Sequence, residues 1–550
     1  MRLLFIVLGF WILCICILAS VPPVLRDELI HHLLVPKYYI ALGGMAELPH
    51  IPFSYYPMNL QMLYWLALYF HLEILPKYIH FAFGLMTTAG IFHYIHYRIN
   101  KHFAILGAVF FLSIPVIVKL SISAYVDLGL VCFSFFSIYG IILWIDHHFH
   151  WKYLVLSAVC CGLCLGTKYN GLVIFLILSL FVAFVYSKYA SQTTRYLSLK
   201  AMGVSCCYIL ISLMLYSPWL IRNYLWTHNP IYPLYDSLFQ RMTKTPEIST
   251  QPKEEQGESV DIFTMRKVEY GESWVEIMML PLRIFFQGKD NKPKYFDGVL
   301  NPFLLLLPIL GFFWKSMNFK SNRIYRDQLI FLTFVLMYFV YSFFTTVMRI
   351  RYISPMIPCL VILSVFGLKQ VYDRIHYSHR HTYALIWVVI ISTLYLAYNG
   401  QYLKSLFDEF QPIAYASGKI TKDEYIERFC PEYPLLKYIN ETLPMDSVVL
   451  YVFIGKRGYY CERKYIPDTQ GNIIKLINII RNANSAKAIY HDLKSWPITH
   501  VLIHIPFMKK TLELDCNMQQ QTMFADFIAH YTQCLRIQNN IGLYELNITN

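Results

Sequence analysis

Residues 103–145, FAILGAVFFLSIPVIVKLSISAYVDLGLVCFSFFSIYGIILWI, decide the fold class. Two apolar runs, 103–120 and 127–145, are separated by a short turn, and the only charged side chains in the stretch are Lys119 and Asp127. Each run is long enough to cross a bilayer as a helix, which takes about 17–25 residues. The stretch therefore predicts a transmembrane helical hairpin.

Similar apolar runs continue from this hairpin in both directions: 3–21, 78–97, 153–168, 170–187, 201–221, 299–314, 328–347, 352–368 and 383–399. With 56% apolar and only 15% charged residues, and a mean hydropathy of +0.42, the chain is too apolar for a soluble globular protein. We predict a polytopic α-helical membrane protein with about eleven transmembrane helices. The first run is longer than the apolar region of a signal peptide, so we interpret it as an uncleaved helix.

The positions of Lys and Arg set the orientation in the membrane. Thirteen basic residues fall in the loops 97–102, 146–152, 188–200, 315–327 and 369–382. Only four, Lys119, Lys168, Arg349 and Arg351, fall in the short turns on the other side. Cytoplasmic loops are enriched in basic residues, so we place the N terminus inside. This parity requires that the 15-residue stretch Met58–Leu72 does not cross, and we place it flat at the outer interface.

We divide the chain into a transmembrane domain, 1–399, with outer loops 22–77 and 222–298, and an extracytoplasmic tail, 400–550. The tail is mixed in character, and its short apolar runs and amphipathic stretches predict a small α/β domain. It contains no nucleotide-binding or phosphate-loop motif, so we expect it to shape a membrane-embedded site. The net charge of +13 reflects the basic residues between spans, and we expect no binding to nucleic acid.

Nine of the thirteen cysteines lie inside predicted spans. The other four are all in the tail: Cys430, Cys461, Cys516 and Cys534. Disulfides persist in extracytoplasmic compartments, and the number of tail cysteines is even. We therefore predict one or two disulfides, with three complete pairings open.

Charged residues gather at the predicted outer ends of the helices. Asp27 and Glu28 follow the first helix, and Asp127 begins a span after an outer turn. Each could merely cap a helix, but four cations share this level: Lys168, Arg222, Arg349 and Arg351. Ionisable groups next to hydrocarbon are costly, which favours a functional role for the whole set. Cations could hold the phosphate of a lipid while a carboxylate activates a hydroxyl group.

These residues occur in short motifs that resemble a known family. The motifs are Asp27-Glu28, Tyr56-Pro57, Asp127, Gly166-Thr167-Lys168-Tyr169, Ser217-Pro218-Trp219 through Arg222-Asn223 to Tyr232-Pro233, and Arg351-Tyr352 with Pro355 and Pro358. Their order and sidedness over residues 1–400 resemble the GT-C glycosyltransferases. The resemblance is to the branch that includes protein O-mannosyltransferases and the lipid A aminoarabinose transferase, and to bacterial members of uncharacterised specificity.

The resemblance implies an enzyme that moves a sugar, with inversion, from a polyprenyl-phosphate-linked donor to a protein, glycan or lipid acceptor. It implies that Asp27 is the general base, with Glu28 and Asp127 beside it, and that Lys168, Arg222, Arg349 and Arg351 bind the donor phosphate. It further implies a bacterial inner membrane protein whose site and tail face the periplasm or exterior. His31-His32 departs from the Tyr-His of related sequences, so we assign the histidines no role.

Three alternatives follow from the same residues. A divalent metal could bind the carboxylates and histidines, but the resemblance is to the monophosphate branch, so we expect no required cofactor. A transporter or flippase for a lipid-linked glycan would also place charges in a membrane, although these charges gather at one face and the halves show no repeat. A scaffold that displays the tail would leave the charged residues unexplained.

Overall fold

The computed structural model describes residues 1–190, 197–243, 262–313, 322–377, 381–470 and 473–547. The chain forms two compact units. Of the described residues, the helical unit contains those within 1–21, 55–243 and 262–413, and the tail unit contains those within 22–54 and 414–547. The part of the predicted first outer loop from Pro22 to Ser54, which carries Asp27 and Glu28, therefore belongs to the same unit as the tail.

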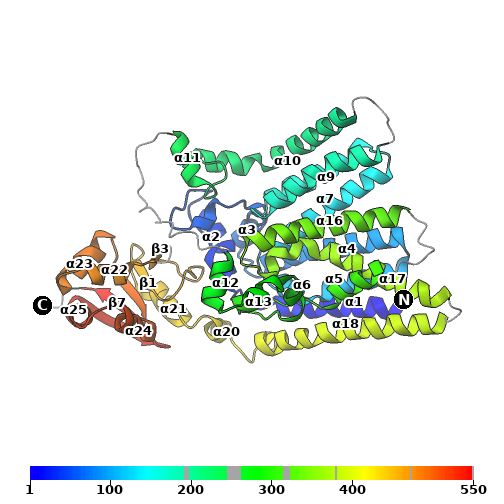
Figure 1. The fold of residues 1–550 in the computed structure, drawn as a ribbon. Coiled ribbons are helices and arrows are strands. Elements are labelled where there is room, and N and C mark those ends of the chain that lie inside the picture. The colour runs from blue at the N-terminus through cyan, green and yellow to red at the C-terminus, as the bar shows by residue number, and fades with distance from the viewer. Residues whose placement is uncertain (191–196, 244–261, 314–321, 378–380, 471–472, 548–550) are drawn as a thin grey trace. The chain divides into compact units, whose positions relative to one another are not determined.

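The long helices of the helical unit run broadly alongside one another (Figure 1). In chain order, the helices that carry the predicted apolar runs, together with α3, are α1 (Arg2–Ala19), α3 (Asn59–Tyr69), α4 (Leu75–Arg98), α5 (Lys101–Ser113), α6 (Pro115–Ser121), α7 (Asp127–Asp146), α8 (Trp151–Leu165), α9 (Gly171–Tyr189), α10 (Leu197–Thr227), α15 (Phe303–Phe313), α16 (Asn322–Thr345), α17 (Ile357–Tyr377) and α18 (His381–Phe410). The helices α11 (Asp236–Thr243), α12 (Ile262–Tyr270), α13 (Trp274–Met278) and α14 (Leu280–Phe286) lie between α10 and α15 in the sequence. A 3-10 helix, η4, covers Ile350–Met356.

Each of the eleven predicted apolar runs lies on a helix. Among the described residues, seven helices are long and apolar enough to cross a membrane, and the α5–α6 pair, bent by 67°, makes an eighth candidate. The chain is thus an integral membrane protein with seven or eight candidate spans. The other three predicted runs lie on α4, which carries buried polar side chains such as Lys77 and His80, and on the shorter helices α8 and α15. The count of eleven stays a prediction.

The bend between α5 and α6 has a local cause. Pro115 begins α6, and its ring disfavours a helical conformation at the preceding residue, Ile114, which has φ −58° and ψ 131°. The α6–α7 turn then presents Asp127. The helix α3 has 11 residues, about 16 Å at 1.5 Å per residue, too short for a hydrocarbon core of about 30 Å. Its length argues against a span, and its placement at the outer interface stays a prediction.

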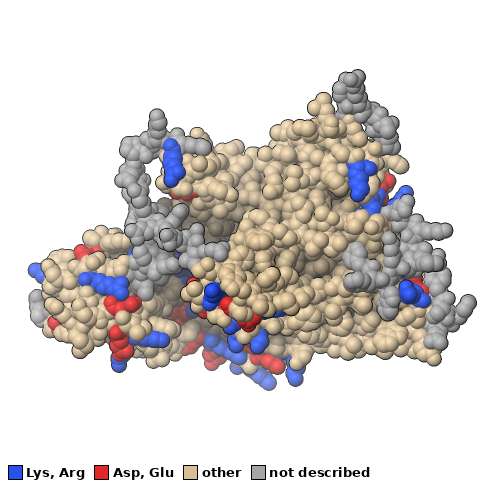
Figure 2. Space-filling model, in the orientation of Figure 1, with Lys and Arg blue, Asp and Glu red and all other residues tan. Residues whose placement is uncertain are grey.

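The core of the helical unit surrounds α7 and α17. In α7, 83% of the apolar window is buried, and the span that ends with α17 is 89% buried, whereas only 17% is buried in α18 and 28% in α1. The face drawn in Figure 2 presents a broad surface on which Lys, Arg, Asp and Glu are sparse. Large exposed side chains such as Leu210 and Met214 on α10 are expected where a helix faces lipid.

The tail unit is built on a five-stranded mixed sheet of order β2-β1-β5-β7-β6. Its strands are β1 (Val448–Val452), β2 (Lys464–Pro467), β5 (His500–His504), β6 (Thr532–Gln538) and β7 (Ile541–Leu546); β3 (Thr469–Gln470) and β4 (Ile473–Ile474) pair separately. The three strands β2, β1 and β5 are parallel, and β7 and β6 continue the sheet antiparallel. Its helices are α2 (Leu34–Ala41), α20 (Lys422–Phe429), α21 (Tyr433–Thr442), α22 (Lys475–Asn482), α23 (Ala486–Ser495), α24 (Ile505–Asp515) and α25 (Met518–Tyr531). The predicted α/β character of the tail is confirmed.

The first outer loop is tied to the tail by main-chain and side-chain hydrogen bonds. The Tyr459 amide donates to the Leu29 carbonyl at 3.2 Å, and Lys37 Nζ donates to the Tyr459 carbonyl at 2.7 Å. The Tyr460 hydroxyl donates to the Pro23 carbonyl at 2.7 Å. The loop that carries Asp27 is therefore part of the tail unit.

The predicted disulfides are not formed, because all thirteen cysteines are free thiols. Cys430 and Cys461 are buried, and each has its own partner: Cys430 Sγ accepts from Arg457 at 3.7 Å, and Cys461 donates to the Arg463 carbonyl at 3.4 Å. Burial raises the pKa of the Cys430 thiol to about 12, which disfavours the thiolate that disulfide formation needs. An even count of cysteines does not bring their sulfur atoms together.

Candidate active site

Asp127 is the first residue of α7, and its side chain is 1% exposed. Its Oδ1 accepts a hydrogen bond from Lys168 Nζ at 2.8 Å. Its Oδ2 is buried and has no hydrogen-bond partner among the residues that the structure describes. A buried carboxylate oxygen without a donor is unfavourable, so this oxygen is available to a substrate group or to water.

The turn that carries Lys168 is held in place by α3. Asn59 lies so close to Gly166 that a Cβ there would approach Asn59 Nδ2 to 2.2 Å, so only glycine fits. The Asn59 main-chain amide donates to the Gly166 carbonyl at 2.9 Å, and Trp219 Nε1 donates to the side-chain Oδ1 of Asn59 at 2.8 Å. The Gly166-Thr167-Lys168-Tyr169 motif is therefore a supported turn that directs Lys168 to Asp127.

Three of the predicted cations surround one aromatic ring, that of Tyr352 in η4. Lys168 Nζ lies 5.3 Å from the ring centroid, and the guanidinium carbons of Arg351 and Arg349 lie 5.3 Å and 6.0 Å from it. Cations at this range are attracted to the negative face of an aromatic ring. The Tyr352 carbonyl accepts from the Tyr338 hydroxyl at 3.0 Å, which anchors the segment. We call these three cations and Tyr352 the Tyr352 cluster.

The charge of this region is positive. Asp127 offsets Lys168, and Asp297 Oδ2 lies 3.7 Å from Arg349 Nη1, a pair whose side chains are 29% and 26% exposed. Arg351 lies 5.4 Å from the ring of Tyr125, in the turn before α7. A half-buried group of three cations with two carboxylates leaves a net positive charge, which suits an anion that carries oxygen atoms, such as a phosphate.

Arg222, the fourth predicted cation, has a different environment. Its Nη2 donates to the Tyr56 carbonyl at 3.0 Å and its Nε donates to Asn223 Oδ1 at 3.1 Å. The guanidinium group lies 4.7 Å from the Trp219 ring and 5.0 Å from the Trp226 ring. These contacts hold the segment around Tyr56 that leads into α3, so Arg222 has a structural role in addition to its predicted role in binding the donor.

The carboxylates of the first outer loop lie in the tail unit. Glu28 is fully buried, and its Oε2 accepts from the Leu25 amide at 2.9 Å, as a capping residue does. Asp27 is half-buried. Asp127 and the four cations belong to the helical unit. The assembly of all seven residues into one site stays a prediction, and among them the structure brings together Asp127 with Lys168, and Lys168 with Arg349 and Arg351.

Two residues that shape this site, Tyr352 and His80, were not identified from the sequence. Tyr352 was noted only as part of the Arg351-Tyr352 motif, although its position directly after Arg349-Ile350-Arg351 could have indicated a residue close to those cations. His80 on α4 gave no signal. Its Nδ1 lies 2.9 Å from the Leu120 carbonyl and 2.8 Å from the Ser123 carbonyl, and its Nε2 accepts from the Leu128 amide at 2.8 Å. His80 thereby holds the α6–α7 turn that presents Asp127.

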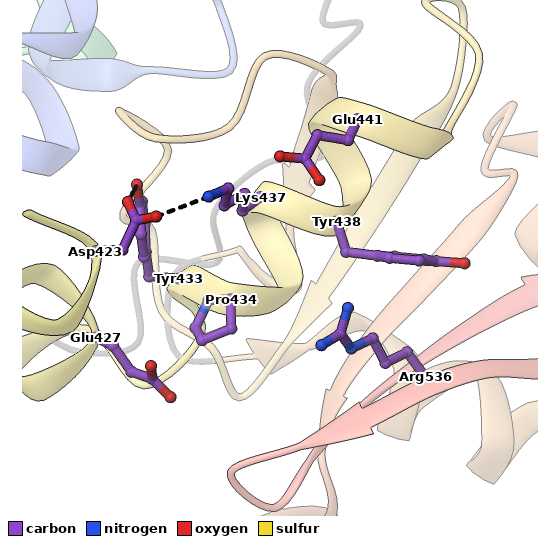
Figure 3. A pocket seen from close by; sticks show the side chains of 8 residues that line it. All are labelled: Asp423, Glu427, Tyr433, Pro434, Lys437, Tyr438, Glu441 and Arg536. Atoms are coloured by element: carbon purple, nitrogen blue, oxygen red, sulfur yellow. Dashed lines mark hydrogen bonds and ion pairs between the residues drawn. The ribbon is translucent and has the colours of Figure 1, made fainter.

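An open cleft of about 270 Å³ lies in the tail unit, between α20, α21 and β6 (Figure 3). Asp423 and Lys437 form an ion pair across it at 2.7 Å, and Arg536 extends from β6 toward the ring of Tyr438. None of the predicted site residues lines this cleft. Because it is lined by none of these residues, we do not assign it to the site.

Among the described residues, no group of three or more His, Cys, Asp or Glu side chains is arranged to hold a metal ion. The expectation that no metal is required stays a prediction. The carboxylates considered as metal ligands are divided between the units, with Asp27 and Glu28 in the tail unit and Asp127 in the helical unit.

Comparison with solved structures identifies the fold. The chain is similar to ArnT from Cupriavidus metallidurans in the apo state, with a TM-score of 0.57, 12% identity, and coverage of 99% of this chain and 97% of that chain. It is similar to the same protein bound to undecaprenyl phosphate, with a TM-score of 0.55, 13% identity, and coverage of 98% and 97%.

A third similar structure is the Archaeoglobus fulgidus oligosaccharyltransferase with a tethered acceptor peptide, with a TM-score of 0.52, 11% identity, and coverage of 99% of this chain and 74% of that chain. No protein-family model and no curated protein matches the sequence. At these identities the likeness concerns the fold. The chain shares the fold of these structures, and this is the fold that the resemblance of its motifs to the GT-C glycosyltransferases implied.

Proposed function

We propose that this protein is a glycosyltransferase that moves a sugar from a polyprenyl-phosphate-linked donor to an acceptor at the outer face of the membrane. The observation that carries the proposal is the Tyr352 cluster beside Asp127, in a chain with the GT-C fold. Further support comes from two structures with this fold, one determined with undecaprenyl phosphate and one with an acceptor peptide.

In the proposed reaction, the acceptor oxygen attacks the anomeric carbon of the sugar. The bond between that carbon and the phosphate oxygen breaks, and polyprenyl phosphate leaves with the electron pair. Attack from the face opposite the phosphate inverts the anomeric centre. Because phosphate is already a good leaving group, one base suffices and no second carboxylic acid has to protonate it.

The cations stabilise the charge that develops on the departing phosphate. Lys168 is held at a fixed position by Asp127 and Tyr352, and Arg351 and Arg349 approach the same ring. Such preorganised charges act without reorganisation during the reaction, which is the basis of electrostatic catalysis. We assign donor-phosphate binding to Lys168, Arg349 and Arg351, with Arg222 in support.

We assign the general base to Asp27, which removes the acceptor proton as the new bond forms. Glu28 supports the loop that carries Asp27, since its buried carboxylate binds the Leu25 amide. Asp127 orients Lys168 through Oδ1, and its Oδ2 remains for the acceptor or for water. The acceptor is a protein, glycan or lipid with a nucleophilic hydroxyl or amine, and we place the reaction at the periplasmic side of a bacterial inner membrane, without a required metal.

The experiment that tests this proposal uses the full chain in nanodiscs and a polyprenyl-phosphate sugar with a radiolabel in the sugar. We expect label to move to a nucleophilic acceptor, with release of polyprenyl phosphate. The rival function, a flippase, is measured in parallel in sealed vesicles. Translocation of the labelled lipid with no transfer product in any acceptor fraction would overturn the proposal and favour the flippase.

A further inference from the structure

A buried ion triad lies in the second outer loop, and neither the proposed donor site nor the proposed base includes it. Glu272 is 2% exposed, and its carboxylate accepts from Arg266 Nε at 2.7 Å and from Arg266 Nη2 at 3.0 Å. Arg283 Nη2 on α14 donates to the same carboxylate at 3.0 Å. Bidentate pairs of this kind have well-defined geometry, and removing one partner leaves buried charge uncompensated.

The two arginines of the triad lie against the ring of Phe296, which is completely buried. The guanidinium carbons of Arg266 and Arg283 lie 5.3 Å and 5.8 Å from the ring centroid. Arg266 also donates to two main-chain carbonyls, that of Lys294 at 3.2 Å and that of Val347 at 3.4 Å. Arg266 therefore joins the loop before Phe296 to the segment that leads into the Tyr352 cluster.

The main chain on both sides of this junction is constrained. The Phe296 carbonyl accepts from the Ile350 amide at 2.8 Å, and the Asp297 carboxylate faces Arg349 at 3.7 Å. Phe296, Asp297 and Met348 have φ values of +68°, +43° and +51°, in the left-handed region that residues other than glycine seldom adopt. Such conformations persist only where the surroundings hold them, and they gather at functional sites.

We propose that Glu272 is a positioning residue for the donor site. Its carboxylate holds Arg266 and Arg283 against Phe296, and Phe296 in turn holds the main chain at Ile350, between the two arginines of the Tyr352 cluster. Among the described residues, the ion pairs of Glu272 are with Arg266 and Arg283 and not with these cations, so it acts through Phe296. The expected effect on donor binding rests on the proposed function, whereas the expected effect on the main chain does not.

The test compares the wild type with Glu272→Gln, which keeps the size of the side chain and removes its charge, and with Glu272→Asp, which keeps the charge. Asp327→Asn is the matched control. Asp327 is also buried between two arginines of the helical unit, Arg98 at 2.7 Å and Arg326 at 2.7 Å, but it has no contact with the Tyr352 cluster among its hydrogen bonds. All variants are full chains in nanodiscs.

The first readout is hydrogen exchange of the peptide that contains Ile350, measured without ligand. We expect exchange about tenfold faster in Glu272→Gln, near normal in Glu272→Asp, and unchanged in Asp327→Asn, because local opening follows the loss of local constraints. Exchange at Ile350 that is unaffected by Glu272→Gln, or equally affected by Asp327→Asn, would overturn the proposal. If Glu272→Gln does not fold, Phe296→Leu takes its place with the same expectation and the same overturning results.

The second readout is binding of undecaprenyl phosphate and, with an active preparation, the split between KM and kcat. We expect Glu272→Gln to raise the Kd and the donor KM about tenfold with a smaller change in kcat, because misplaced cations weaken charge-assisted contacts. A Kd equal to that of the wild type would overturn the link to the donor site. Failure of the wild type to bind the lipid would instead overturn the proposed function, and the exchange data would still decide the role of Glu272.

Discussion

Asp127 and Asp146 are the first and last residues of the same helix, α7, and their carboxylates are used in opposite ways. Arg98 binds Asp146 Oδ2 at 2.5 Å and Arg326 binds Oδ1 at 2.7 Å, so both oxygens are occupied. Asp127 gives one oxygen to Lys168 and keeps the other without a partner among the described residues. The two carboxylates lie about 28 Å apart along a helix that rises 1.5 Å per residue. Of the two ends of α7, only the Asp127 end has a carboxylate oxygen without a hydrogen-bond partner among the described residues.

This contrast supplies a matched pair of variants. We expect Asp127→Asn to lower kcat/KM for transfer by about tenfold or more, because Lys168 loses the charge that orients it. We expect Asp146→Asn to lower the thermal unfolding midpoint, because two arginines lose a buried partner, while the folded fraction keeps near-normal kinetics. Equal losses of kcat/KM in the two variants would mean that Asp127 has only a structural role.

Asp27 is the proposed base, and its removal should affect the chemical step. We expect Asp27→Asn to reduce kcat by about 10² to 10⁴ while undecaprenyl phosphate still binds, since the amide keeps the volume but cannot take a proton. Transfer of a labelled sugar and lipid binding are measured on the same preparation. Near-normal turnover in a well-folded Asp27→Asn protein would exclude Asp27 as the base.

The cations of the Tyr352 cluster should act on donor binding. We expect Lys168→Ala and Arg351→Ala each to raise the donor KM by about 10- to 100-fold, the effect of losing a hydrogen bond to a charged group. Lys119→Ala is the control, because in the described part of the chain Lys119 pairs with Asp290, at 3.3 Å, and not with the ring of Tyr352. An unchanged KM in both cluster variants would contradict the assignment of the phosphate site.

A carboxylate in the tail unit should give that unit a measurable pH dependence. Asp468 is 2% exposed, its Oδ1 accepts from the Leu476 amide, and burial raises its pKa to about 6. Its pKa in the unfolded chain is about 3.9, so between about pH 4 and pH 6 the folded state holds a proton that the unfolded state has released. Stability therefore falls as the pH rises through this window, and the loss is complete above it.

Asp468→Asn removes this titration and keeps an acceptor for the Leu476 amide. We expect the variant to be more stable than the wild type above pH 6, by on the order of 2 kcal/mol, with the difference fading toward pH 4. Thermal unfolding of the full chain in detergent, measured from pH 4 to pH 8, provides the comparison. A difference that does not change with pH would show that ionisation of Asp468 is not its source.

The cysteines allow the predicted orientation to be tested. Cys534 is exposed in the tail, whereas Cys430, Cys461 and Cys516 are buried. We expect a membrane-impermeant maleimide to label Cys534 in intact cells whose outer envelope is permeabilised, and to reach the three buried thiols only after unfolding. Labelling of Cys534 that requires opening of the inner membrane would contradict an extracytoplasmic tail.

Much of the architecture could be read from the amino-acid pattern. In hydrocarbon every main-chain amide and carbonyl must be paired within its own segment, so each long apolar run has to be a helix, and each one is. The mixed composition of residues 400–550, which lack long apolar runs, distinguished the tail from the transmembrane domain. The resemblance of the motifs to the GT-C glycosyltransferases implied the fold that the solved structures share with this chain.

The particular contacts of the candidate site depended on the tertiary structure. Lys168 and Arg351 are far apart in the sequence, and whether they share the ring of Tyr352 depends on how α8, α9 and η4 are rotated and packed, which periodicity does not specify. Glu28 was predicted beside the base, and the structure shows that one of its carboxylate oxygens accepts from the Leu25 main-chain amide, a contact that the sequence did not reveal. The Glu272 triad could not be predicted from the sequence of a polar loop, because only the folded structure shows that Glu272 contacts Arg266 and Arg283. Composition and the apolar pattern determined which segments are helices and where charged residues gather, because these depend on whether a segment faces hydrocarbon or water. Which side chains from distant segments contact one another was decided by the packing of the tertiary structure.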